Sequence, residues 1–220
     1  MDRPRTRQRV EDERTDRRLE RGARTRYSIA RHAVDVASRE GLNGISIGGL
    51  ASDLGLSKSG VQALFGTKEN LQVAAVEAAR AAFLAAVTRP AMTTPPGAAR
   101  LRALIDRWIE YVEAPLFPGG CFWVANLANF DSCPGPVRDA LFHDQREWRS
   151  LIAGELRYAI DAGEIAELDT ELAAFQIDAV LGAANTALRL GDGDPVEKVH
   201  RVIAGFLVPP VGERSPTRHA

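Results

Sequence analysis

Apolar residues recur every three or four positions along most of the chain. This spacing puts apolar side chains on one face of a helix, whereas a half-buried strand needs strict alternation, which is absent. Internal repeats are also absent. The pattern therefore predicts an all-α fold of about nine helices. The expected helices span about residues 26–40, 47–54, 58–64, 68–88, 101–112, 121–130, 136–160, 169–190 and 195–207.

Three of the expected helices begin directly after a residue that can cap them. Ser46, Ser57 and Thr67 each precede an apolar-periodic segment, and their hydroxyl oxygens can accept a hydrogen bond from a free backbone N–H of the first turn. Gly55 separates the first two of these segments and Gly66 ends the second. Two short capped helices joined by a glycine turn, each with one apolar stripe, predict a three-helix helix-turn-helix unit with the helix at 26–40.

A helix-turn-helix places the N-terminal residues of its third helix against base edges in the major groove. Here Lys58 can donate to guanine and Gln62 can bond adenine, while small neighbours allow close approach. The helix starts at Ser46 and Thr67, helped by Lys68, can hold phosphates. The predicted DNA-binding residues are Ser46, Ser57, Lys58, Ser59, Gly60, Gln62, Thr67 and Lys68.

The net charge of −1 hides an asymmetry along the chain. Residues 1–90 carry 16 Lys/Arg against 11 Asp/Glu, and the remainder carries 12 against 18. A basic first part fits a polyanion-binding head. Nine arginines and few large apolar groups in the first 24 residues predict a mobile arm. The predicted organisation is a flexible basic arm (1–24), a helix-turn-helix domain (25–70), a ligand-binding and dimerisation domain (71–208) and a flexible tail (209–220).

The segment ISIGGLASDLGLSKSGVQALFGTKENL, residues 45–71, resembles the DNA-binding domain of the TetR family of regulators. Two later stretches, at 119–122 and 130–138, resemble one subset of that family. The resemblance implies a homodimer with one recognition helix in each major-groove half-site. It also implies a ligand pocket in the C-terminal bundle and release of DNA when the pocket fills. Gln62 and Leu64 stand where the family often has an aromatic or histidine side chain. Leu64 cannot donate a hydrogen bond, so one contact with a DNA phosphate is absent or supplied by the arm.

The C-terminal part supplies many aromatic side chains at helical spacing, which can form core or line a mostly apolar cavity with a few polar anchors. The candidate ligand-binding residues are Phe83, Trp108, Tyr111, Phe122, Trp123, Asn126, Trp148, Phe175 and Asp178, with Gln145, Gln176 and Asn185 as further polar anchors. The expected partner is a small apolar ligand.

The last two expected helices carry apolar residues on more than one face, which calls for a second packing partner. In the helix at 169–190, one stripe (Leu172, Phe175, Ala179) is assigned to the core and the other to a second chain. A two-fold four-helix interface would bury both faces, and a thick monomeric core is the alternative. The predicted dimer-interface residues are Leu181, Ala184, Leu188, Ile203 and Phe206.

No catalytic constellation is recognisable, and no cofactor or metal is expected. His143 and Glu147 share a helix face without a third ligand, and Cys121 and Cys133 are expected to be inert. The sequence shows neither a signal peptide nor a membrane span, which predicts a cytoplasmic protein. The function expected is a ligand-responsive repressor that binds a palindromic operator as a homodimer. The alternatives are a helical-bundle enzyme or a protein-docking adaptor with a vestigial DNA-binding head.

Overall fold

The computed structural model describes residues 4–114 and 116–210. Every regular element in these ranges is helical, which confirms the all-α prediction. The elements are α1 (Pro4–Glu40), α2 (Ile47–Asp53), α3 (Lys58–Phe65), α4 (Lys68–Phe83), the π-helix η1 (Leu84–Thr88), α5 (Arg89–Ala91), α6 (Ala98–Glu113), α7 (Phe122–Phe130), α8 (Pro136–Asp161), α9 (Thr170–Leu190) and α10 (Pro195–Phe206). Since α4, η1 and α5 follow each other without a break, the described ranges hold nine continuous helical segments.

Side-chain caps fix where most of these helices begin. Ser46, Ser57 and Thr67 each accept a hydrogen bond from the backbone N–H three residues further on. Asp169 and Asp194 do the same for α9 and α10. Each cap satisfies an N–H that has no partner inside its own helix. The helix starts predicted from these residues are confirmed.

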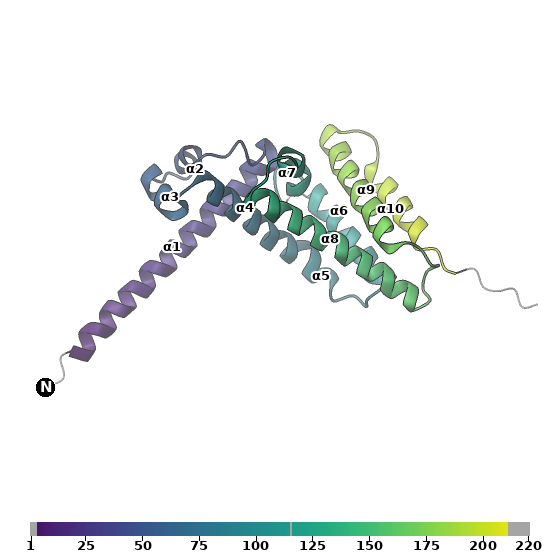
Figure 1. Ribbon diagram of the computed structural model, residues 1–220, viewed down its shortest axis with the longest axis horizontal. Helices are drawn as coiled ribbons and strands as arrows, with labels where there is room; N and C mark the ends of the chain where they lie inside the picture. Colours follow the sequence, from purple (N-terminus) through teal and green to yellow (C-terminus); the bar gives the residue numbers. More distant parts are fainter. Residues whose placement is uncertain (1–3, 115, 211–220) are drawn as a thin grey trace, which may run out of the picture.

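Helix α1 begins much earlier than its apolar pattern predicts. The expected start near Arg26 is wrong, because the structure continues the helix back to Pro4 and carries it away from the rest of the protein (Figure 1). Arginine and glutamate are good helix formers, and Arg24 pairs with Glu20 one turn before it. The mobility predicted for residues 1–24 stays a prediction. Residues 211–220, most of the predicted flexible tail, lie outside the described ranges.

The long helical stretch from Lys68 to Ala91 changes its winding near its end. The expected helix ends at about residue 88, yet the helical stretch continues through Pro90, which lies inside α5. Proline lacks an N–H and its ring crowds the carbonyl four residues before it. The wider π-turn of η1, in which the Arg89 N–H donates to the carbonyl of Leu84, precedes this position. The stretch is long and apolar enough to cross a membrane, but half of its most apolar window is buried inside the protein, as in a core helix.

Figure 1 shows the helices arranged in two parts. We call α1 from Arg26 onward together with α2 and α3 the head, and α4 to α10 the bundle. Helix α4 joins them, because it packs on α1 in the head and on α8 in the bundle. Helix α8 in turn packs on α9, and α9 on α10. The hydrophobic core is continuous from the head into the bundle.

Candidate functional site

The head presents the first turns of α3 to solvent. Val61 and Phe65 are buried and anchor the opposite side of this helix. Gly55, at φ +63°, forms the turn from α2 to α3, a backbone conformation that L side chains rarely adopt. The result is a short, rigidly based helix whose polar side faces outward.

All eight predicted DNA-binding residues lie on the surface of the head or at the start of α4. Two of them already have partners within the protein. Gln62 donates to the carbonyl of Gly66, and Lys68 donates to the carbonyl of Asn43 at 2.7 Å. Lys58 makes no such contact within the described ranges, so its ammonium group is the one most available to a nucleic acid.

Arg26 fixes the position of α3 and was not singled out by sequence reasoning. Its guanidinium donates to the carbonyl of Leu64 at 2.6 Å and lies 4.5 Å from the centre of the Phe65 ring. The carbonyl belongs to the last turn of α3, where a positive charge is favoured by the helix dipole. The arginine-rich context of residues 1–24 gave no signal that this arginine differs from its neighbours.

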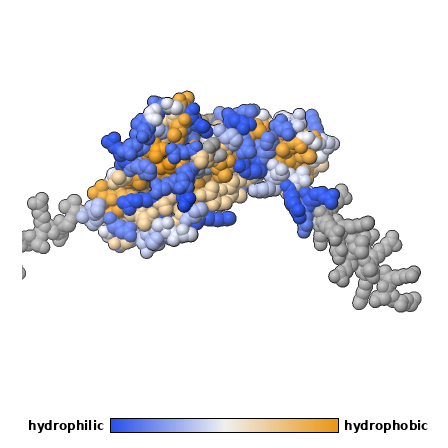
Figure 2. All heavy atoms as spheres, turned by 180° about the vertical axis from the view of Figure 1, so that it is seen from behind, coloured by the Kyte–Doolittle hydropathy of each residue, from blue (hydrophilic) through white to orange (hydrophobic). Residues whose placement is uncertain are grey.

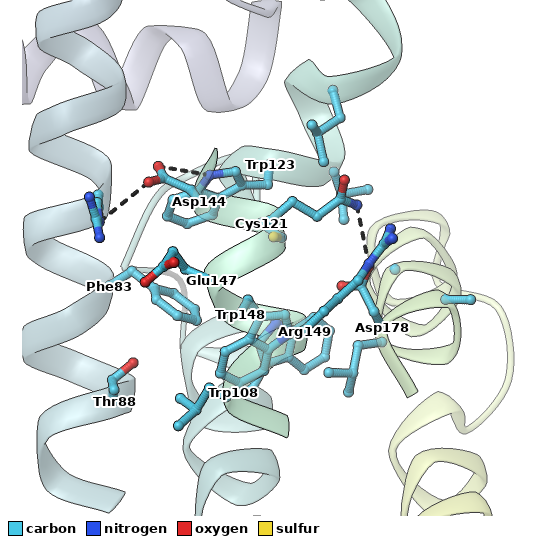
Figure 3. A pocket seen from close by; sticks show the side chains of 18 of the residues that line it. Phe83, Thr88, Trp108, Cys121, Trp123, Asp144, Glu147, Trp148, Arg149 and Asp178 are labelled. Carbon is cyan, nitrogen blue, oxygen red and sulfur yellow. Dashed lines mark hydrogen bonds and ion pairs between the residues drawn. The ribbon is translucent and has the colours of Figure 1, made fainter. Parts of the chain in front are cut away.

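The bundle contains a partly open cavity of about 460 Å³, within the usual range for a small-molecule site. Figure 3 shows α4 on one side, α8 and α7 across the middle and α9 on the other side. Six of the nine predicted ligand-binding residues line it: Phe83, Trp108, Trp123, Trp148, Phe175 and Asp178. The three tryptophans are all the tryptophans of the chain.

The other three predicted ligand-binding residues are buried beside the cavity without lining it. The backbone N–H of Phe122 donates to the Tyr111 hydroxyl at 3.0 Å, and Phe122 is fully buried. Asn126 points toward the head instead. The sequence pattern could not distinguish residues that pack beside the cavity from residues that line it.

Polar groups face the cavity from opposite walls, as the dashed lines in Figure 3 show. On one wall, Asp144 accepts from Trp123 Nε1 and pairs with Arg80 at 3.3 Å. On the other, Asp178 pairs with Arg149 at 2.7 Å and accepts from Gln145. Burial raises the pKa of Asp144 above its ordinary value, although Arg80 opposes the rise.

Sequence reasoning missed the charged lining residues Arg80, Asp144, Glu147 and Arg149. The available signal was the spacing on α8, where charged residues stand one turn from Trp148 or Gln145. Charged residues on an amphipathic helix are usually assigned to its solvent face, so these residues were not predicted to line a cavity. Gln145 had been named as a possible anchor.

The two cysteines lie in different surroundings. Cys121 is buried against the cavity and Cys133 is exposed, and both are free thiols. Burial raises the pKa of the Cys121 thiol, and burial likewise raises the pKa of Tyr111 beside it. Both groups are therefore held in their neutral forms at neutral pH.

Two buried amide side chains hold the turn that follows α1. The Leu42 N–H donates to Asn126 Oδ1 of α7 at 2.6 Å, and Gln72 Nε2 of α4 donates to the Leu42 carbonyl at 2.9 Å. Asn126 also donates to the carbonyl of Ala37 in α1. We call Asn126 and Gln72 the Leu42 clamp. It joins the head to two helices that line the cavity.

A close backbone approach reinforces this junction. The Gly119 N–H donates to Ser38 Oγ at 3.0 Å. A Cβ at Gly119 would lie 1.9 Å from the Ser38 carbonyl oxygen, so only glycine fits there. The Arg31 guanidinium donates to the carbonyl of Leu116 in the same loop. The resemblance at 119–122 thus falls on residues that dock the loop before α7 against α1.

The residues predicted for a dimer interface lie mostly inside the protomer. Leu181, Ala184 and Ile203 are buried, and Leu188 and Phe206 are partly buried against the core. The stripe assigned to the core is exposed instead, with Leu172 at 53% and Phe175 at 54%. Helical periodicity separates two faces but cannot tell which one faces inward. We call the exposed face the α9 stripe: Leu172, Phe175, Gln176, Ala179, Ala183 and Thr186.

The surface view supports a division of roles between the two parts. Figure 2 shows hydrophilic surface where α1 leaves the head and broad apolar areas over the bundle. Groups of three or more residues that could hold a metal ion are absent from the described ranges. An exposed, capped recognition helix joined to a helical bundle with an aromatic cavity defines the class of helix-turn-helix transcription regulators.

Comparisons with known proteins place the chain within that class. Residues 97–203 match the family described as "Tetracyclin repressor-like, C-terminal domain". A TetR transcriptional regulator from Chloroflexus aurantiacus J-10-FL is similar at a TM-score of 0.78 and 25% identity, covering 85% of this chain and 96% of that one. Residues 97–203 therefore form a tetracycline repressor-like C-terminal domain, and the chain as a whole has the fold of TetR transcriptional regulators. These regulators are DNA-binding proteins rather than enzymes.

Two further solved structures share the fold. A TetR-family regulator from Cytophaga hutchinsonii has a TM-score of 0.73 at 20% identity, covering 86% of this chain and 98% of that one. AibR, solved in complex with isovaleryl coenzyme A and operator DNA, has a TM-score of 0.68 at 19% identity, covering 84% of this chain and all of that one. A search of curated protein sequences finds no match.

Proposed function

We propose that this protein is a cytoplasmic repressor that binds a palindromic operator as a homodimer and releases it when a small, largely apolar ligand fills the bundle cavity. The observation that carries the proposal is the Leu42 clamp. Its two amides come from α4 and α7, and both helices also line the cavity. A ligand that favours one arrangement of α4 and α7 therefore also selects a position of the head.

The DNA-binding part of the proposal depends on the exposed face of α3. Lys58 lies at its N-terminus, where a side chain reaches base edges in the major groove. Selection from random duplexes should yield a palindrome with half-sites about one helical turn apart. Lys58→Ala should weaken binding to that site about tenfold without altering oligomeric state. Lys68→Ala should weaken it less, because Lys68 also bonds Asn43. Equal binding to all duplexes would contradict the proposal and favour a protein-docking role for the head.

The ligand part is tested on the same complex. Compounds that raise the melting temperature of the free protein are added to the protein–operator complex in a mobility-shift assay. Release of DNA at concentrations that saturate the cavity supports the repressor mechanism, and retention of DNA by every such compound contradicts it. AibR, a protein of this fold solved in complex with isovaleryl coenzyme A and operator DNA, binds both a small molecule and DNA.

The homodimer is assigned to the α9 stripe rather than to the residues first predicted. Its small and apolar side chains are exposed along one helix face, which in a single chain would leave them in water. Ala183→Glu puts a charge in the middle of this face and should give a monomer in light scattering. Ala99→Glu is the matched control, since Ala99 is an exposed alanine of α6. Dimers in both variants would place the interface elsewhere.

The basic start of the chain is proposed to contact DNA phosphates next to the operator. Each phosphate neutralised adds about −0.9 to the slope of log affinity against log salt concentration. Deleting residues 1–18 should therefore make that slope shallower while leaving Arg26 and the head intact. An unchanged slope would show that the arm takes no part in binding.

A further inference from the structure

The loop between α6 and α7 is bonded to the head at two points along α1. The Arg31 guanidinium donates to the Leu116 carbonyl at 3.0 Å. The Gly119 N–H donates to Ser38 Oγ, also at 3.0 Å. Arg31 and Ser38 are separated by about two helical turns, or about 10 Å along the helix axis. Two contacts this far apart fix the direction of α1 as well as its position. We call residues 116–121 the connecting loop.

The other side of the connecting loop is bonded to α9. The Cys121 N–H donates to Oδ1 of the buried Asn185 side chain at 2.8 Å. One turn further along α9, the Arg189 guanidinium donates to the Pro118 carbonyl at 3.4 Å. The connecting loop therefore joins α1 to α9 through side-chain hydrogen bonds on both of its sides.

The connecting loop fits closely between these two helices. A Cβ at Gly119 would lie 1.9 Å from the carbonyl oxygen of Ser38 in α1. A Cβ at Gly120, where φ is +88°, would lie 2.6 Å from Oδ1 of Asn185 in α9. Contacts packed this closely transmit a displacement instead of absorbing it. A movement of α9 is therefore passed on to α1.

The turn of α9 that holds the connecting loop also carries part of the α9 stripe. Asn185 is buried and bonds the loop, whereas Ala183 and Thr186 on either side of it are exposed members of the stripe. In the proposed homodimer, the second copy contacts one side of this turn and the connecting loop contacts the other. A single helical turn then separates the dimer interface from the loop that holds the head.

We propose that Asn185 is a positioning residue for DNA recognition. Through the connecting loop it fixes α1 relative to the dimer interface, and so sets the separation of the two α3 helices on DNA. The Leu42 clamp ties the head to two helices of the cavity, whereas the connecting loop supplies fixed contacts about which the head can tilt. This inference rests on the homodimer through the α9 stripe in the proposed function.

Duplexes that differ only in half-site spacing test the proposal. One base pair is inserted at the centre of the selected operator or removed from it, which changes both the separation and the relative rotation of the half-sites. The wild type should bind the original spacing at least about tenfold more tightly, because bridging the wrong spacing requires the DNA to be deformed. Ser38→Ala and Asn185→Ala should each reduce this preference about fivefold. Neither change touches α3, so binding to a single half-site should stay the same.

The double variant separates a broken connection from a loss of stability. Ser38→Ala and Asn185→Ala remove bonds at opposite ends of the same connection, so together they should reduce the spacing preference no further than either does alone. Independent effects would add instead. Ile177→Ala is the control, because it removes a buried apolar side chain of α9 and no hydrogen bond to the loop. It should lower the melting temperature and keep the spacing preference.

An unchanged spacing preference in Ser38→Ala would overturn the proposal, and so would additive effects in the double variant. Alanine is the best helix former, so Ser38→Ala should remain folded and decide the matter even if Asn185→Ala does not fold. A dimeric wild type that prefers one spacing, with variants that keep the preference, would reject this inference alone. A wild type that is monomeric in light scattering, or binds all spacings equally, would reject the proposed homodimer on its operator as well.

Discussion

The head and the bundle use their polar residues in opposite ways. In the head, the polar residues of α3 face solvent, and Lys58 has no partner within the described ranges. In the bundle, most of the charged residues that line the cavity are paired with each other, as Arg149 is with Asp178. A surface that reads DNA must keep its donors free until DNA arrives. A cavity must neutralise its buried charges in advance, because unpaired charge is costly away from water.

The junction between the two parts offers the most severe test of this comparison. Gly119→Ala would place a methyl group 1.9 Å from the Ser38 carbonyl oxygen, where backbone has to move. We expect the free energy of unfolding to fall by about 2–4 kcal/mol. Urea denaturation followed by circular dichroism measures it. Gly154→Ala, in the middle of α8 with open space around it, should instead stabilise by about 0.5–1 kcal/mol. A harmless Gly119→Ala would show that the loop is not docked on α1.

Removing half of the Leu42 clamp comes next in size. Asn126→Ala leaves the buried Leu42 N–H without an acceptor, which should cost about 2–3 kcal/mol. In the same variant, ligand binding should release operator DNA less effectively, since α7 no longer forms the Asn126 hydrogen bonds to Leu42 and Ala37. Asp131→Ala, at an exposed position directly after α7, serves as the control. Full ligand response in Asn126→Ala would assign the coupling to α4 alone.

A smaller effect separates positioning of α3 from contact with DNA. Arg26→Ala removes the bond to the Leu64 carbonyl and the contact with the Phe65 ring. We expect a loss of about 1–2 kcal/mol in stability together with weaker operator binding. Lys58→Ala should weaken operator binding alone, and Arg24→Ala, an exposed arginine, should leave stability unchanged. The melting temperature and mobility-shift affinity of all three variants decide the matter.

The smallest effect concerns pH. The pKa of Asp144 is raised in the folded state, so this group favours folding below the ordinary pKa of aspartate and loses that contribution as pH rises through the folded value. Asp144→Asn cannot ionise. The stability of the variant relative to the wild type should therefore increase as pH rises from about 4 to 7. A decrease over this range would mean that pairing with Arg80 outweighs burial.

The two parts also differ in how far the sequence predicts them. The head follows from local signals, because Ser46, Ser57 and Thr67 cap helices within one short stretch and the DNA-facing residues lie beside the caps. In the bundle, the helices were predicted but not their orientation, since α9 is apolar on two faces and the wrong one was assigned to the core. The cavity collects side chains from α4, α6, α7, α8 and α9, and no local pattern identifies such a set. The N-terminal extension of α1 was not predicted, because apolar periodicity cannot detect a helical segment that has no apolar face.

The two hydrogen bonds of the Leu42 backbone have one further consequence. The Leu42 N–H donates a hydrogen bond to Asn126 of α7, and its carbonyl accepts one from Gln72 of α4. The two hydrogen bonds are therefore separated by only the φ and ψ angles of Leu42. If both helices move together, the head is carried along without reorienting. If α4 moves relative to α7, the backbone of Leu42 must rotate to keep both hydrogen bonds. That rotation tilts the head. In the proposed mechanism the head therefore responds to the relative displacement of the two helices, and ligands of different shape that cause the same displacement have the same effect on the head.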